Sequence, residues 1–158
     1  MANTQSMCTS FMSELMTGTH NFGTAPIRAA STADTFKAAL YLASATVNAS
    51  TTAYSATGEA SGAGYSAGGV SVTNATPPSS TNASATAGVA YWTPSASITY
   101  TSVTLTTAFD TVLIYNNTQS NKAVSVHTFG SQTVTAGTFT LTMPSNTTTA
   151  ALLRLATT

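Results

Sequence analysis

The chain has 158 residues, the size of one ordinary domain, and we expect a single domain over residues 1–158. Only 5% of the residues are charged, and the four Lys or Arg balance the four Asp or Glu, which leaves no basic stripe for nucleic acid. The one cysteine, Cys8, excludes an internal disulfide and a thiolate metal cluster. No stretch approaches the roughly 20 apolar residues of a membrane helix, so no membrane partner is expected.

Residues 1–20 carry the pattern of a short amphipathic helix. Apolar residues recur there at helical spacing, namely Met7, Cys8, Phe11, Met12, Leu15 and Met16. Thr4 is a candidate N-cap, and Gly18 is a candidate helix end. Such a stripe packs either on the domain's own sheet or on a neighbouring subunit, and the sequence leaves both alternatives open.

A β domain is expected over residues 35–158. Its first strand is predicted over 35–42, where Phe36, Leu40 and Leu42 fall on one face. Residues 44–69 are rich in Gly, Ser and Thr and have the composition of a long loop. A connection of this length in a compact domain is usually functional or is ordered by another element, so this loop is a candidate contact surface.

The second half of the chain alternates more clearly. Over residues 97–105 the inward face changes near Ser102, which predicts a β-bulge, and residues 112–115 are apolar at every position, as in a central strand. Further predicted elements are strands at 70–73, 122–129, 138–143 and 150–155, and a turn at 136–137. Short strands at regular spacing predict an all-β fold, a β-sandwich or jelly-roll-like domain with a short N-terminal amphipathic helix.

Reactive side chains are sparse. His127 and Asp110 can be combined with a serine into a triad on paper, but no nucleophile-elbow pattern presents the serine hydroxyl. Two histidines and four scattered carboxylates do not make a metal-binding pattern. We therefore expect no enzymatic activity, no cofactor and no metal site.

The few charges and the aromatic residues raise two hypotheses. Lys37 and Glu59 are expected to pair with each other, internally or across an interface, because an unpaired buried charge is unfavourable. Four aromatic residues either fill a core, anchor a protein interface or form a platform for a sugar ring. They are Tyr54, Tyr65, Tyr91 and Trp92.

Several motifs follow one another in a fixed order over nearly the whole chain. They are Met7-Cys-Thr-Ser-Phe11, His20-Asn-Phe22, Phe36-Lys-Ala-Ala-Leu-Tyr41, the stretch 54–69, Leu113-Ile-Tyr-Asn116 and Ala136-Gly-Thr-Phe139. This order resembles a family of small structural proteins of tailed-bacteriophage virions. The resemblance implies a virion component made in the cytoplasm of the bacterial host, and the family has no catalytic motif to carry over.

The resemblance and the composition together predict a capsid decoration or cement protein that stabilises the phage head through subunit contacts. The expected partners are other virion proteins, either the major capsid protein or neck and tail subunits, and further copies of the chain. The alternative is a neck or tail-fibre component that binds a host receptor or glycan. Candidate interface residues are Met7, Phe11, Leu15, Tyr54, Glu59, Tyr65, Tyr91 and Trp92.

Overall fold

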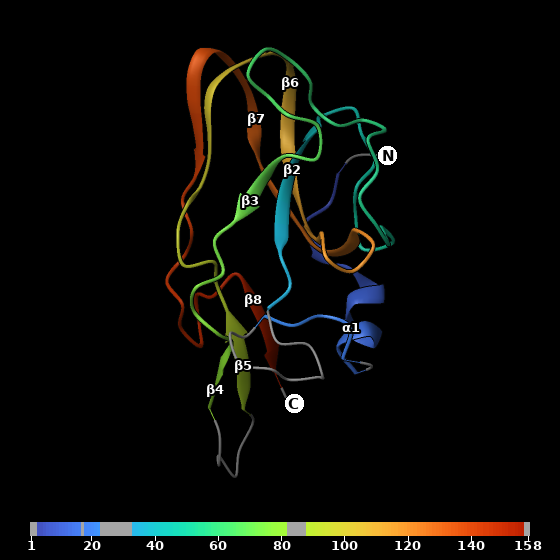
Figure 1. Cartoon of the computed structure of the whole chain (residues 1–158), viewed down its shortest axis with the longest axis vertical. Coiled ribbons are helices and arrows are strands. Elements are labelled where there is room, and N and C mark those ends of the chain that lie inside the picture. Colours follow the sequence, from blue (N-terminus) through green and yellow to red (C-terminus); the bar gives the residue numbers. More distant parts are fainter. Residues whose placement is uncertain (1–2, 17, 23–32, 82–87, 157–158) are drawn as a thin grey trace.

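A computed structural model describes residues 3–16, 18–22, 33–81 and 88–156 of the chain. The described part is nearly all β, with two antiparallel sheets, which confirms the all-β prediction and is consistent with a sandwich (Figure 1). The elements are β1 (Ser6–Met7), α1 (Thr9–Met16), β2 (Phe36–Leu42), β3 (Val70–Val72), β4 (Ser79–Ser80), β5 (Val89–Trp92), β6 (Ile98–Asn116), β7 (Lys122–Leu141) and β8 (Leu153–Ala156). The larger sheet has the order β1-β7-β6-β2-β3, and the smaller one β4-β5-β8.

The N-terminal segment contributes both a strand and a helix. β1, which the sequence pattern did not indicate, pairs Ser6 with Val126 at the edge of the larger sheet. Helix α1 follows with eight residues, and Gly18 after it has a φ of 68°, a conformation that glycine adopts without strain. The helix is too short and too polar to cross a membrane, and so is every other helical stretch of the described chain. The side chains of Met12 and Met16 lie outside the described part.

β2 is a central strand of the larger sheet. It lies between β6 and β3, and its residues 38–41 are buried on both faces of the sheet. The sequence predicted one inward face with Phe36, Leu40 and Leu42. In the structure Ala39 and Tyr41 on the other face are buried as well, and Leu42 is partly exposed. Small side chains at Ala38 and Ala39 allow neighbouring elements to approach both faces of this strand closely.

β6 and β7 form one very long hairpin, with 19 and 20 residues. The predicted separate strands at 97–105 and 112–115 are two parts of β6, and those at 122–129 and 138–143 belong to β7 or continue it. The predicted bulge is confirmed, since the register shifts between Tyr100 and Val103 and Ser102 has a φ of 53°. The predicted turn at 136–137 is wrong: Ala136, with a φ of 47°, is a bulge inside a continuous strand.

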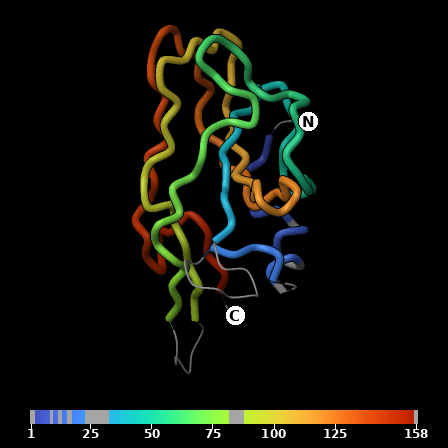
Figure 2. The backbone as a smooth tube through the Cα atoms, in the orientation of Figure 1, coloured from blue at the N-terminus to red at the C-terminus, as the bar shows by residue number. Residues whose placement is uncertain are grey.

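The hairpin is folded over on itself (Figures 1 and 2). The regular pairing of β6 with β7 is interrupted near the middle of the hairpin, at residues 106–108 of β6 and at residues 129–131 of β7. We call residues 98–105 with 132–141 the outer ribbon. It packs against the other half of the hairpin through an edge-to-face contact between Phe109 and Phe139, with ring centroids 5.0 Å apart. Tyr100 of the outer ribbon also donates a hydrogen bond to the Ala38 carbonyl of β2 at 2.9 Å.

The Gly/Ser/Thr-rich loop 44–69 is ordered by its own domain. It runs beside β6, where Ala63 forms a bridge with Thr104. A side chain at Gly62 would overlap with the Thr104 carbonyl, and one at Gly69 would overlap with the Ala38 carbonyl. Gly69 also has a φ of 70°, so close approach and backbone conformation both require glycine there.

The smaller sheet lies at one end of the larger one (Figure 1). Its strands β4 and β5 were not predicted, and the predicted last strand at 150–155 is observed as β8, three residues later at its start. Trp92 of β5 joins the sheet to the main core, because its ring lies 4.8 Å from that of Phe22 and 6.2 Å from that of Phe36. Residues 23–32, which include Pro26, lie outside the described part of the chain.

Replacement of Gly69 by alanine should lower the free energy of unfolding by at least about 2 kcal/mol, because the new Cβ meets the backbone of β2 at a positive φ. Gly130→Ala is the matched control. The nearest atom to a Cβ there is Gln132 Nε2 at 4.0 Å, so the change should stay within about 0.5 kcal/mol. Urea denaturation of both variants measures the difference, and equal effects would contradict the packing of the loop.

Candidate functional site

The eight candidate interface residues fall into two separate groups. Met7, Phe11, Leu15, Tyr91 and Trp92 line one apolar groove. Tyr54, Glu59 and Tyr65 form a hydrogen-bonded cluster on the loop 44–69. The structure therefore brings together residues from distant parts of the sequence, but it does not unite the four aromatic residues into one platform.

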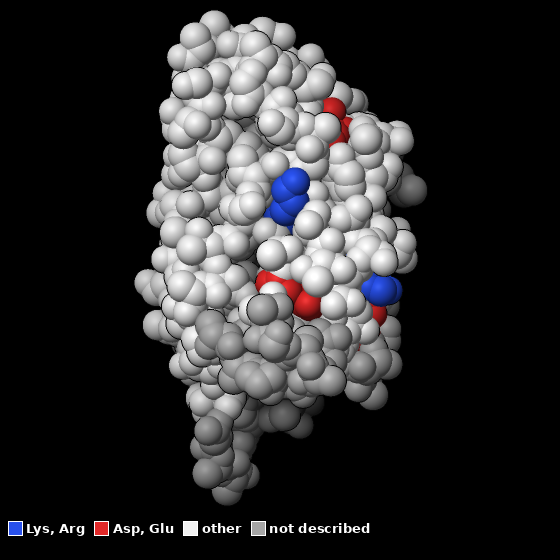
Figure 3. Space-filling model, in the orientation of Figure 1, with Lys and Arg blue, Asp and Glu red and all other residues white. Residues whose placement is uncertain are grey.

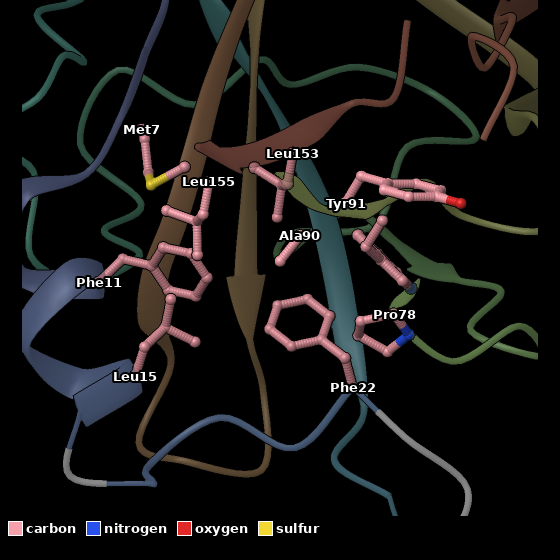
Figure 4. A pocket seen from close by; sticks show the side chains of 10 residues that line it. Met7, Phe11, Leu15, Phe22, Pro78, Ala90, Tyr91, Leu153 and Leu155 are labelled. Atoms are coloured by element: carbon pink, nitrogen blue, oxygen red, sulfur yellow. The ribbon is translucent and has the colours of Figure 1, made fainter. Parts of the chain in front are cut away.

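The apolar groove lies where α1 and β1 face the smaller sheet (Figure 4). It is lined by Met7, Phe11, Leu15, Phe22, Pro78, Ala90, Tyr91, Trp92, Leu153 and Leu155. Every one of these side chains has an apolar body, and no charged residue is among them. Leu155 is 41% exposed, and it is the only large hydrophobic side chain that is exposed in the described part of the chain.

The floor of the apolar groove is fixed by Trp92. This residue is only 2% exposed, and its indole N–H donates to Asn74 Oδ1 at 3.0 Å and to the Thr76 carbonyl at 3.1 Å. A sugar ring that stacks on an aromatic residue needs an exposed face of that residue, which Trp92 does not offer. Trp92 therefore serves the core, and Tyr91 remains partly exposed beside it.

The groove has the size of a side chain. Its volume is about 90 Å³. Pockets for small molecules and cofactors usually hold roughly 300–1,000 Å³ and contain a few polar groups that orient the ligand. An apolar recess of this size instead suits one or two side chains from another protein, which is how an anchor residue is buried in an interface.

Glu59 holds the loop 44–69 together. One carboxylate oxygen accepts a hydrogen bond from the Tyr54 hydroxyl at 2.6 Å, and the other accepts from the Tyr65 hydroxyl and the Gly68 N–H, both at 2.8 Å. Burial and the hydrogen bonds to Glu59 raise the pKa of both tyrosines. The hypothesis of an internal Lys37–Glu59 pair is wrong for the described residues, where the ion pairs found are those of Glu14 and where Glu59 accepts from two tyrosine hydroxyls and one backbone N–H.

A second polar cluster, absent from the sequence predictions, lies beneath α1. His20 Nε2 is 2.7 Å from Glu14 Oε2, and Lys122 donates to Glu14 Oε1 at 2.6 Å. Asn116 links His20 to Asp34 through contacts of 3.0 and 2.8 Å. These residues are up to 108 positions apart, so no local sequence motif predicts the cluster. The one available signal was the rarity of charged residues in this chain, which makes each of them a candidate for a specific contact.

The protonation of His20 follows from its neighbours. The side-chain oxygen of Asn116 accepts two backbone N–H groups, at residues 118 and 119, so its amide nitrogen must face the ring and donate to His20 Nδ1. Nε2 then carries the proton and donates to Glu14. Burial lowers the pKa of His20 and outweighs the attraction of Glu14. Burial alone would raise the pKa of Glu14, but Lys122 and His20 bring it below its ordinary value.

The suggested catalytic triad does not form. His127 Nε2 lies 2.9 Å from the Ser125 hydroxyl, whereas Asp110 is bonded to Asn3 at 2.8 Å and to Thr111 at 2.7 Å. Burial lowers the pKa of His127 to about 4, so the imidazole is neutral at neutral pH. Within the described ranges, no three His, Cys, Asp or Glu side chains are grouped as metal ligands.

Comparisons with protein-family models, with curated proteins and with solved structures found no match to this chain.

Removal of the Tyr65 hydroxyl should destabilise the protein. Tyr65→Phe deletes a donor to the Glu59 carboxylate and an acceptor for the Leu40 N–H, so we expect a loss of about 1.5–3 kcal/mol. Tyr91→Phe is the control, because no hydrogen bond is found for the Tyr91 hydroxyl among the described residues, and its effect should stay within about 0.5 kcal/mol. Denaturant unfolding that ranks the two variants equally would exclude a stabilising role for this cluster.

The stability of the protein should fall in mild acid. Folding lowers the pKa of His127 from 6.5 to about 4, so the unfolded chain binds the extra proton between these values. The contribution is complete above about pH 6.5 and is lost as the pH falls toward 4. A His127→Gln variant should therefore show a shallower decline over this range, by up to roughly 1 kcal/mol per pH unit. Unfolding titrations at several pH values measure it, and parallel profiles would contradict the assignment.

Proposed function

We propose that this chain is a structural subunit of a tailed-phage virion, and specifically a decoration or cement protein on the capsid. The observation that carries the proposal is the scarcity of charge: only 5% of the residues are charged, and the face seen in Figure 3 shows a few charged patches among otherwise uncharged residues. All four carboxylates of the chain have hydrogen-bond partners within the domain, and Lys122 is paired with Glu14. What remains outside is mainly Thr, Ser, Gly and Ala.

A surface of this kind suits a crowded assembly. Soluble monomers are usually kept apart by mixed surface charge and a net charge away from zero, whereas this chain has a formal net charge of +0 at pH 7. Desolvation of neutral, hydroxyl-rich strands costs less free energy than desolvation of charged ones. Many weak contacts that are repeated by symmetry then add up to a stable shell. The chain needs no reactive group for such a role.

The apolar groove supplies an anchoring point for a neighbouring subunit. Leu155 stands at its rim, and the groove accepts a side chain rather than a metabolite. The sequence resemblance to small virion proteins supports the same reading. The partner in this role is the major capsid protein or a neighbouring neck or tail subunit, which would insert an apolar side chain into the groove.

Incorporation into virions tests the proposal. Quantitative mass spectrometry of purified particles should find the chain in an amount comparable to the major capsid protein. Leu155→Glu places a charge at the rim of the apolar groove and should reduce incorporation at least about tenfold, the effect of losing roughly 1.4 kcal/mol per contact. Ser61→Glu, on an exposed loop residue, adds the same charge and should be incorporated normally.

Three results would count against the proposal. Absence of the wild-type chain from purified particles would overturn it. A copy number of only a few per particle would exclude capsid decoration and favour the neck or tail-fibre alternative. Equal incorporation of the two variants would remove the apolar groove from the interface.

A further inference from the structure

Among the described residues, the outer ribbon ends in a strand edge that no other strand pairs with. β1 pairs with β7 only at Ser125 and Val126. Beyond them, from residue 128 to 141, the ladder to β6 is the only pairing that β7 makes among the described residues. The outer ribbon is thus a layer of two strands, and its β7 edge presents backbone N–H and C=O groups with which a further strand can pair.

This edge lacks most of the devices that keep strand edges apart. Soluble proteins usually protect an exposed edge with charged side chains, proline, bulges or a covering loop. Between Ala123 and Leu141 the strand contains neither a charged residue nor a proline. A bulge is present at Ala136, but it leaves residues 137–141 as a regular segment, and five residues is an ordinary strand length.

The side chains along this segment are also suited to pairing with a further strand. Phe139 and Leu141 face inward but remain only partly buried, and Thr138 and Thr140 are exposed on the opposite face. An added strand would bury more of the two apolar side chains, and it would place hydroxyl groups beside the two threonines. Cross-strand contacts of both kinds stabilise antiparallel pairs.

We infer that residues 137–141 of β7 pair antiparallel with the same segment of a second copy of the chain. A two-fold axis makes the segment its own partner, centred on Phe139: Phe139 meets the Phe139 of the second copy, each Thr138 meets a Thr140, and each Leu141 lies opposite a Gly137. Self-pairing brings no like charges together, since the segment carries none and the formal net charge of the chain is +0. Two outer ribbons then form one continuous layer of four strands.

Charge placed on the edge tests this pairing. In the double variant Thr138→Lys and Thr140→Lys, the two-fold axis would bring lysines of both copies together. The control is Thr57→Lys with Ser61→Lys, which adds the same charge to exposed positions on the loop beside the other edge of β6. Sedimentation equilibrium of the free chain should give twice the 16.0 kDa mass for the wild type and the control, and one chain mass for the edge variant.

Each other outcome overturns the inference. A wild type that stays monomeric at all concentrations excludes the dimer, and an edge variant that dimerises like the wild type excludes this edge. Should the edge variant fail to fold, a spin label on a Thr140→Cys variant decides, because strong coupling between two labels supports the pairing and its absence excludes it. The dimer does not depend on the virion role, so failure of one test leaves the other intact.

Discussion

The contact between Phe109 and Phe139 determines how the rest of the domain is arranged. These rings belong to the two halves of one hairpin, and their contact requires the hairpin to fold over at residues 106–108 and 129–131. A straight ladder of this length would expose the inward side chains of both halves to water, and burial of large apolar and aromatic side chains is a major favourable contribution to folding. The bend converts a single hairpin into two layers.

Other features follow from that fold. β2 pairs with residues 109–116 of β6 in the larger sheet, and the Tyr100 hydroxyl of the outer ribbon donates a hydrogen bond to its backbone. The part of β6 beyond β2, at Thr104, is covered by the loop 44–69. This loop needs glycine where its backbone runs against strand carbonyls. The opposite side, along residues 128–141 of β7, has no strand partner among the described residues. An unpaired edge is therefore a consequence of folding two layers from one hairpin.

The distribution of charge follows a different logic. The carboxylates of Glu14, Asp34 and Glu59 are used to fix the segments around α1 and the loop 44–69, where irregular backbone has polar groups to satisfy. Hydrogen bonds to a carboxylate are stronger than neutral ones, so a few acids hold long irregular segments in place. Because these acids are bonded to groups of the domain itself, few charges are left for contacts with other molecules, and this scarcity links the internal architecture to the proposed assembly role.

Local pattern predicted the parts of the structure that depend on local pattern. The strand at 36–42, the bulge at Ser102 and the alternation after Thr138 were all indicated by the spacing of apolar residues. The continuity of β7 through residues 136–137 was not predicted, because the Ala136–Gly137 bulge has the same composition as a turn. The His20 cluster and the partners of Glu59 also escaped prediction, since they depend on tertiary contacts between residues far apart in the sequence.

The most direct test of this account is a nuclear Overhauser measurement on the folded protein. Centroids 5.0 Å apart place ring protons of Phe109 and Phe139 within range of each other, so cross-peaks between the two rings should be present. Cross-peaks that follow a straight β6–β7 ladder, with none between these two rings, would show that the hairpin does not fold over.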